Sequence, residues 1–249
     1  MKIVATLALL IAALAIAACG EKANSGGNES APSGSLPQGS ERVDLNPADF
    51  TTEIDNPHWP MQPGSHWVYR ETAAGAVQRV DVKITGRTKR IANGVEARVV
   101  RDVVTQGGEP VEVTDDWYAQ DSDGNIWYLG ERTAEYENGK VVSREGSWEA
   151  GVDGAQPGIA LPADPRVGMT YRQEYYAGVA EDNGKVLSLD EQVEVPFGHF
   201  TGVLMTKDLN PLEPRLLEHK FYARGVGPVL TLDISGAAGR EELVSYTGG

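Results

Sequence analysis

Apolar and polar residues alternate with a period of two through most of the chain after residue 51. In residues 80–85, valine and isoleucine alternate with aspartate, lysine and threonine, and the same alternation runs through 111–120, 169–176 and 187–195. A period of two places successive side chains on opposite faces of an extended strand. Because no stretch shows a sustained helical stripe with caps, the pattern predicts a mainly β protein with few or no helices.

Turn signals separate these alternating runs. They are Ala74-Gly75, Asn93-Gly94, Gly107-Gly108, Asp123-Gly124-Asn125, Asn138-Gly139 and Asn183-Gly184. Asparagine and glycine tolerate the positive φ angles that two-residue hairpin turns require. We therefore predict one domain of roughly 9–11 antiparallel strands that form a curved sheet or half-barrel.

Residues 146–168 interrupt the alternation. Glycine and proline are too frequent there for an ordinary strand, so the composition predicts a long loop. Long loops in compact domains are often functional, and this one could cover a cavity. The simpler interpretation is a crossover from one edge of the sheet to another.

The N-terminal residues carry an export signal. Lys2 precedes an uncharged apolar run that ends in Ile16-Ala17-Ala18-Cys19-Gly20. This ending resembles the lipobox of bacterial lipoprotein precursors, in which the cysteine receives diacylglycerol. The run is shorter than the roughly 18–20 residues of a membrane-spanning helix, and an ordinary secretory signal would not require a cysteine. We expect residues 1–18 to be removed as a signal peptide and Cys19 to be lipidated.

The composition after Cys19 divides the remaining chain in two. Residues 19–48 are rich in glycine, serine, asparagine and proline, which predicts a disordered tether behind the lipidated cysteine. Residues 49–249 form the β domain, and a turn or short helix is expected at residues 46–50. Gly20 stands where an aspartate would favour retention in the inner membrane, so we expect the outer membrane, with the domain facing the periplasm.

The charge and the single cysteine exclude several kinds of partner. The formal net charge is −14, and no basic cluster is visible along the sequence. Nucleic acid is therefore not expected, because phosphate binding depends on lysine and arginine. Contact with the membrane is expected through the lipid anchor and not through attraction to anionic lipid. Once Cys19 is acylated, no thiol remains for a disulfide or a metal.

Two short motifs lie near the ends of the β domain. Residues 57–69 read Pro-His-Trp-Pro-Met-Gln-Pro-Gly-Ser-His-Trp-Val-Tyr, and residues 221–227 read Phe-Tyr-Ala-Arg-Gly-Val-Gly. They resemble a group of uncharacterised bacterial lipoproteins whose domains are thought to share the open half-barrel of the LolA and LolB lipoprotein carriers. The resemblance implies a curved antiparallel sheet with an apolar concave face and a hydrophobic ligand. It maps no ligand-binding residue onto this chain.

The densest group of candidate binding residues is aromatic. Trp117, Tyr118, Trp127 and Tyr128 flank a short turn and could stack on a sugar or line an apolar cavity. In an alternating strand, one residue of each neighbouring pair faces inward and the other outward. Core packing and pairing across the two strands explain the same residues without a ligand.

No motif for catalysis, cofactor binding or metal binding emerges. Asp121, Asp123 and Asn125 have the spacing that begins a calcium loop, but Ile126 and Arg132 occupy the positions of its glycine and glutamate, so a tight hairpin turn is expected. None of the four histidines has a paired spacing, and serine-nucleophile and phosphate-loop motifs are missing. Abundant carboxylates leave a two-carboxylate glycosidase open.

These observations favour a non-enzymatic envelope lipoprotein. The leading hypothesis is that the concave face binds or carries an apolar or amphiphilic small molecule. One alternative is a structural lipoprotein that binds another envelope protein. The other is a hydrolase of envelope sugars, which requires two carboxylates about 5–10 Å apart in one cleft.

Overall fold

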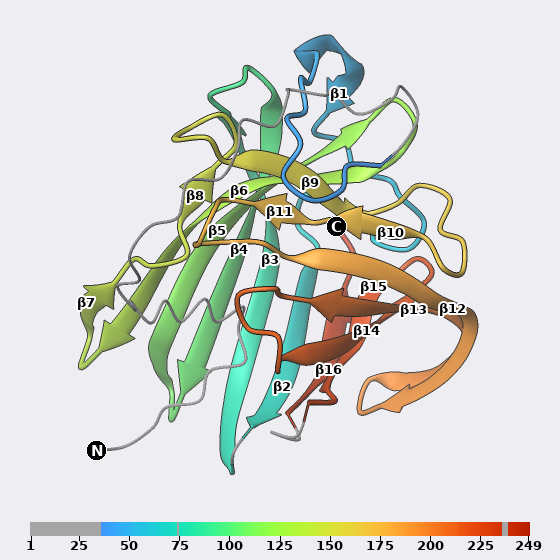
Figure 1. The fold of residues 1–249 in the computed structure, drawn as a ribbon. Helices are drawn as coiled ribbons and strands as arrows, with labels where there is room; N and C mark the ends of the chain where they lie inside the picture. Colours follow the sequence, from blue (N-terminus) through green and yellow to red (C-terminus); the bar gives the residue numbers. More distant parts are fainter. Residues whose placement is uncertain (1–35, 74, 236–238) are drawn as a thin grey trace.

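The computed structural model describes residues 36–73, 75–235 and 239–249 (Figure 1). The expected signal peptide and Cys19 lie outside these residues. The described elements are η1 (Pro47–Asp49), β1 (Phe50–Thr51), β2 (His66–Ala73), β3 (Ala76–Arg90), β4 (Glu96–Gln106), β5 (Glu109–Asp121), β6 (Ile126–Glu137), β7 (Lys140–Ser143), β8 (Trp148–Glu149), β9 (Gln156–Leu161), β10 (Thr170–Arg172), β11 (Glu174–Tyr175), β12 (Asn183–Val195), β13 (Gly198–Leu209), β14 (Leu217–Ala223), β15 (Gly227–Asp233) and β16 (Arg240–Thr247).

The strands form one antiparallel sheet that curves into a nearly closed barrel (Figure 1). Its order is β10-β12-β13-β14-β15-β16-β2-β3-β4-β5-β6-β9-β11, with β1, β7 and β8 paired beside this path. The edge strands β10 and β11 are separated only by Gln173, so the chain itself passes across the seam. The mainly β prediction is confirmed. The strands outnumber the prediction because several are only two to four residues long.

Most of the predicted turns join neighbouring strands. Asn93-Gly94 lies between β3 and β4, and Asn138-Gly139 lies between β6 and β7, where both residues have positive φ angles of 51° and 72°. The turn predicted at Asn183-Gly184 is wrong, since both residues begin β12. The ring of Tyr171 on the neighbouring strand occupies the space that a Cβ atom at Gly184 would need. Close packing therefore explains this glycine.

The prediction for residues 146–168 was wrong in part, because this segment contains β8 and β9. Strand β9 pairs with β6 on one side and with β11 on the other. A Cβ atom at Gly158 would collide with the carbonyl groups of Arg172 and Gln173. Gly158, one of the glycines that argued against a strand, is therefore the residue that allows β9 to pass close to the backbone of residues 172–173.

The described part of the expected tether, residues 36–48, lies against the barrel. The fully buried guanidinium group of Arg172 donates hydrogen bonds to the carbonyl oxygens of Gly39 at 2.9 Å and Glu41 at 2.7 Å. The backbone N–H of Arg172 donates to Pro37 at 2.7 Å. Further on, Asn46 caps η1, where the short helix was expected.

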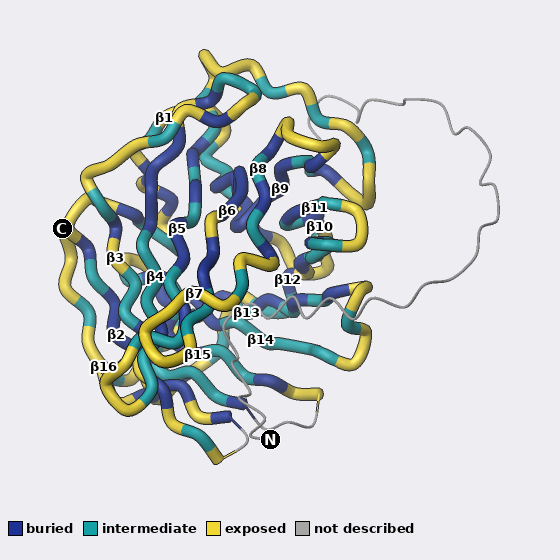
Figure 2. Tube along the Cα trace, turned by 90° about the vertical axis from the view of Figure 1, so that its left-hand side faces the viewer, coloured by how far each residue is buried: buried dark blue, intermediate teal, exposed yellow. Residues whose placement is uncertain are grey.

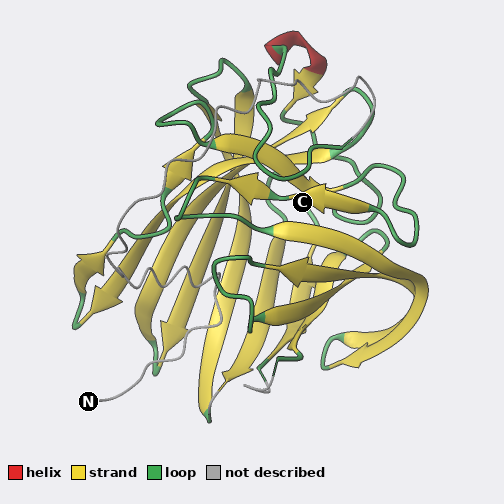
Figure 3. Cartoon of the chain, viewed as in Figure 1, coloured by secondary structure: helices red, strands yellow, loops and turns green. Residues whose placement is uncertain are grey.

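Loops and the short helix gather at the end of the barrel that carries β1 (Figure 3). Buried residues follow the strands, whereas exposed residues concentrate at the turns (Figure 2). The largest fully buried apolar side chains include Trp67, Leu129 and Leu243. The described residues include no helix with the length and hydropathy to cross a membrane.

Candidate functional site

Strand β5 shows which of its two faces lies inside the barrel. Glu112, Thr114, Asp116 and Tyr118 share one face. The ring of Tyr118 lies 5.5 Å from that of Trp59, which lies 5.9 Å from the ring of Tyr222 on β14. Because β5 and β14 are far apart in the strand order, these rings meet across the interior. The polar face of β5 is therefore its inner face.

Acidic side chains from many strands share this inner wall. They are Glu71 on β2, Asp102 on β4, Glu112 and Asp116 on β5, Glu131 on β6, Glu174 on β11, Asp208 on β13, Glu218 on β14 and Glu241 on β16. Pairing places Glu71 opposite both Gln78 and Glu241, and Asp116 opposite Glu131. The inner wall is therefore not the purely apolar concave face that the family resemblance implies. Acidic side chains lie on it beside buried apolar ones such as Tyr69, Val80 and Val104.

One group of these carboxyls lies on β2, β4, β5 and β16. Burial raises the pKa of Asp102 well above its usual value, and the carboxylates of Asp116 and Glu241 raise it further. Burial likewise raises the pKa of Glu112 to about 7 and that of Glu241 to about 8, with neighbouring carboxylates adding to both shifts. Glu112 and Glu241 therefore change charge near neutral pH.

Asp116 and Glu131 share the hydroxyl group of Tyr128. The Tyr128 oxygen lies 2.8 Å from Asp116 Oδ1 and 2.7 Å from Glu131 Oε2. A tyrosine hydroxyl has one proton to donate, so both contacts are hydrogen bonds only if one carboxyl is itself protonated. Burial raises the pKa of Asp116 to about 7 and that of Glu131 to about 8, consistent with a retained proton.

Lys220 faces the acidic residues of β13 and β14. Its Nζ atom lies 2.8 Å from Asp208 Oδ2 and 3.8 Å from Glu218 Oε2. Burial opposes its charge, but the two carboxylates outweigh burial and raise the pKa of Lys220. The lysine is therefore a fixed cation, and its side chain keeps 21% of its surface exposed, so solvent reaches this part of the wall.

Gln78 shows that the inner wall has unused hydrogen-bonding capacity. The residue is only 4% exposed, and neither its Nε2 nor its Oε1 atom has a hydrogen-bond partner among the described residues. The Oδ1 atom of Asp102 is buried without a partner in the same way. Buried polar atoms of this kind are rare in folded proteins, and those of Gln78 and Asp102 are available to a polar ligand.

The four aromatic residues proposed as a binding site divide between the two faces. Tyr118 and Tyr128 stack with their ring centroids 5.0 Å apart on the inner face. Trp117 lies on the opposite face, with Lys89 Nζ 4.5 Å from its ring centroid. Trp127 donates a hydrogen bond to Asp121 at 2.7 Å. The structure therefore brings the two tyrosines to the acidic wall and leaves the two tryptophans outside it.

Residues 121–125, whose spacing resembles the start of a calcium loop, form the β5–β6 hairpin turn, as predicted. The carboxylate of Asp121 accepts hydrogen bonds from the backbone N–H groups of Asp123 at 3.1 Å and Asn125 at 2.8 Å. Among the described residues, no group of three or more histidine, cysteine, aspartate and glutamate side chains is arranged to hold a metal ion.

A separate surface pocket of about 310 Å³ lies between His58, Arg224 and residues 163–165. Arg224 Nη1 is 3.1 Å from His58 Nε2, and burial together with this cation lowers the pKa of His58. The pocket therefore joins the two sequence motifs near the ends of the β domain. Asp164 in its rim is bonded to Arg166.

Sequence reasoning missed the acidic wall because it assumed that apolar side chains face inward. On β5, Val111 and Val113 share a face with Trp117, whereas Glu112 and Asp116 occupy the other face. A recognisable signal was the recurrence of charged residues on one face of a predicted strand: Glu112 with Asp116, and Glu218 with Lys220. Without the strand order, these positions could not be brought together.

Comparisons with known proteins identify no family. No family model and no curated protein matches the chain. A crystal structure of a presumed exported protein with a YmcC-like fold from Bacteroides fragilis is 14% identical, with a TM-score of 0.44, and the match covers 76% of this chain and 98% of that one. A presumed lipoprotein from Parabacteroides distasonis is 12% identical, with a TM-score of 0.41 and the same coverage. Neither is described as a LolA or LolB carrier, and similarity this low establishes no common function.

Proposed function

We propose that this chain is a lipid-anchored envelope protein whose barrel interior binds a small organic cation with more than one amine group. The observation that carries the proposal is the acidic inner wall. The charged neighbours that act on Asp102 and Glu112 are other carboxylates. Buried anions are costly unless they are paired, so a bound cation would stabilise this wall.

The arrangement of the wall favours an extended ligand. Its carboxyls lie on β2, β4, β5, β6 and β16 and do not converge on one point. Separated amine groups could each meet a carboxylate. The unpaired Gln78 amide could add a hydrogen bond. An amphiphile with an amine headgroup fits this description, whereas a wholly apolar ligand would bring no positive charge to the carboxyls.

The membrane anchor is supported by the sequence. The Ile16-Ala17-Ala18-Cys19 ending matches the lipoprotein pattern at each position. By the same reasoning, Gly20 directs the protein to the outer membrane, facing the periplasm. Growth of cells with radiolabelled palmitate tests this, because the wild-type chain should take up label and a Cys19→Ser variant should not. Equal labelling of both would contradict the anchor.

Titration calorimetry of the full chain with spermidine tests the ligand class. Binding should be tighter at about pH 8 than at about pH 5.5, because the inner carboxyls with pKa values of about 7 to 8 ionise between these conditions. The double variant Asp102→Asn/Glu241→Gln should lose most of the affinity.

A matched control removes the same charge from the outer surface. Asp190 and Glu194 are exposed residues of β12, so Asp190→Asn/Glu194→Gln should bind spermidine like the wild type. If the two double variants lost affinity equally, binding would reflect only the overall negative charge. An absence of binding heat with the wild type would also contradict the proposal.

One observation favours a second candidate, a hydrolase of envelope sugars. The Asp116 and Glu131 oxygens that contact Tyr128 lie at most about 5.5 Å apart, so this carboxyl pair is close enough together for the roughly 5–5.5 Å spacing of retaining glycosidases. Turnover of a chromogenic glycoside that is abolished by either Asp116→Asn or Glu131→Gln would support this function. Equal turnover by the variants and the wild type would exclude it.

A further inference from the structure

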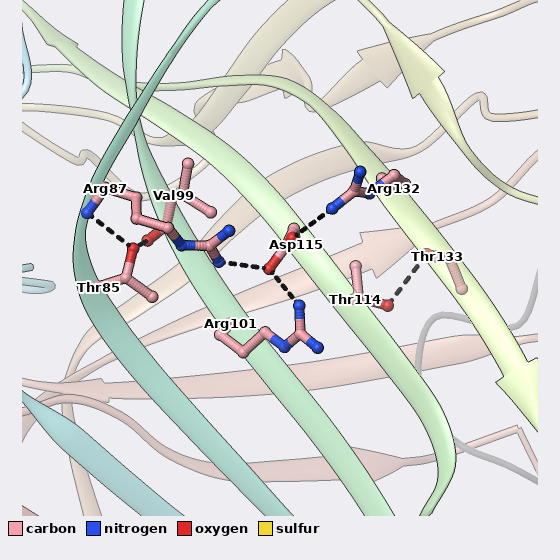
Figure 4. A network of polar contacts seen from close by, with 8 residues as sticks. All are labelled: Thr85, Arg87, Val99, Arg101, Thr114, Asp115, Arg132 and Thr133. Atoms are coloured by element: carbon pink, nitrogen blue, oxygen red, sulfur yellow. Dashed lines mark hydrogen bonds and ion pairs between the residues drawn. The ribbon is translucent and has the colours of Figure 1, made fainter. Parts of the chain in front are cut away.

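The outer wall of the barrel carries a basic patch that is not visible in the sequence. Asp115 is only 3% exposed and accepts hydrogen bonds from three arginines, each at 2.9 Å (Figure 4). Arg87 comes from β3, Arg101 from β4 and Arg132 from β6. We call Lys83, Arg87, Arg101, Asp115 and Arg132 the arginine patch.

Strand register assembles most of the arginine patch. Lys83 is paired with Arg101, Arg101 with Asp115, and Asp115 with Arg132, so these four residues form one row across β3, β4, β5 and β6. Four cations against one carboxylate leave three positive charges in this small area, on a chain with a net charge of −14. Like charges placed directly opposite each other across strands, such as Lys83 and Arg101, are destabilising.

Asp115 holds the three guanidinium groups in position without using most of their donors. Their side chains make no other hydrogen bond within the described residues, and a guanidinium group has five N–H donors. The side chains of Arg87, Arg101 and Arg132 are 54%, 39% and 62% exposed. Most of their donors therefore face solvent in a fixed arrangement, and phosphate oxygens are well suited to such forks.

We propose that the arginine patch docks on phosphate-bearing lipid headgroups of the membrane that holds the lipid anchor, so that β3–β6 face the bilayer. This inference rests on the anchor in the proposed function. Only 16 residues separate Cys19 from Leu36, the first described residue. The disordered tether that the composition predicts would span on the order of 20 Å at that length, so we expect the bilayer surface to be the nearest extended anion.

The charge distribution makes this docking orientation-specific. An acidic protein is repelled by an anionic surface as a whole, and attraction acts only within about a Debye length, roughly 10 Å. The arginine patch can approach the headgroups, whereas the rest of the chain, which carries the net negative charge, is repelled. The arginine patch would therefore orient the barrel and would not by itself recruit the protein.

Arginine modification by phenylglyoxal tests the proposal within one protein. The full chain is reconstituted into vesicles of phosphatidylcholine alone, or of phosphatidylcholine with an equal amount of phosphatidylglycerol. Modification at each arginine is then measured by mass spectrometry. Arg87, Arg101 and Arg132 should be protected several-fold with the anionic vesicles only. Arg70 and Arg240, which both bond Glu242 elsewhere on the outer wall, are the internal control and should react equally in both.

Matched variants sharpen the result. Protection of Arg101 should disappear in Arg87→Gln/Arg132→Gln and persist in Arg70→Gln/Arg240→Gln, although both remove two positive charges.

Vesicle flotation distinguishes a failure of the docking from a failure of the lipid anchor. Protein that floats with both vesicle types without protection of the arginine patch overturns the docking. Flotation with anionic vesicles alone, or with neither vesicle type, contradicts the anchor and with it the docking that rests on the anchor. Protection by inorganic phosphate without vesicles would reassign the arginine patch to a soluble anion.

Discussion

Asp115 and Asp116 are adjacent on β5 and face opposite sides of the barrel wall. Although burial alone would raise the pKa of Asp115, hydrogen bonds from Arg87, Arg101 and Arg132 lower it below its usual value. Burial raises the pKa of Asp116 to about 7, since no cation opposes it there. One step along the strand therefore separates a permanent anion of the outer wall from a titrating group of the inner wall.

The first prediction concerns pH. Glu112, Glu131 and Glu241 have folded pKa values of about 7 to 8, above their values in the unfolded chain, so the folded state binds more protons between about pH 4.5 and pH 8. The free energy of unfolding should therefore fall as pH rises through this window, by on the order of a few kcal/mol. Thermal unfolding at pH steps measures this. A melting temperature that rises toward pH 8 would contradict the buried acidic wall.

The second prediction follows from the same loss of stability when buried carboxyls ionise. Glu241→Gln removes one ionising carboxyl from the inner wall while keeping its shape, so the variant should melt at a higher temperature than the wild type at about pH 8. The difference should shrink at about pH 5, where Glu241 is already protonated. Spermidine should stabilise the wild type more than Glu241→Gln at the higher pH. A variant that is less stable than the wild type at pH 8 would count against the repulsion argument.

The third prediction concerns the shared hydroxyl. Tyr128→Phe leaves Asp116 and Glu131 without their common partner and should lower the free energy of unfolding by about 1–3 kcal/mol. Tyr118→Phe is the matched control, because the two rings stack and the Tyr118 hydroxyl makes no hydrogen bond within the described residues. Denaturant titration of both variants decides the matter, and an equal effect would show that only ring packing is important.

The fourth prediction concerns the crossing of β9. Gly158→Ala places a Cβ atom against the carbonyl groups of Arg172 and Gln173, so it should destabilise the fold by about 1–3 kcal/mol or more. Gly86→Ala meets nothing within 4 Å and should change stability by no more than about 0.5 kcal/mol. Chemical unfolding compares the two, and a tolerated Gly158→Ala would mean that the seam can open to make room.

The fifth prediction concerns the segment before the barrel. Arg172→Met removes the donors that hold the carbonyl oxygens of Gly39 and Glu41, so residues 36–48 should detach. Trypsin should then cut after Arg42 much faster than in the wild type, while the exposed Arg166→Met serves as the control. Unchanged cleavage in Arg172→Met would show that other contacts hold this segment.

Much of the fold was predictable because its determinants are local. Alternation along residues 80–85 and the Asn93-Gly94 turn specify two strands and the hairpin between them, since both effects act within a few residues. The hairpin around Asp121 was predictable for the same reason. The strand at Gly158 was not, because the carbonyl groups that exclude a side chain there belong to Arg172 and Gln173, which composition cannot place nearby.

The sequence alone thus determined the class of fold, most of its turns and the lipoprotein-like N-terminal pattern. Tertiary structure decided which face of each strand lies inside the barrel and which charges meet there. Glu71 meets Glu241 because β16 pairs with β2, and Lys83 aligns with Arg132 only through the register of four strands. Electrostatic interactions depend on distance in space, and the register between strands, which no local pattern records, determines that distance.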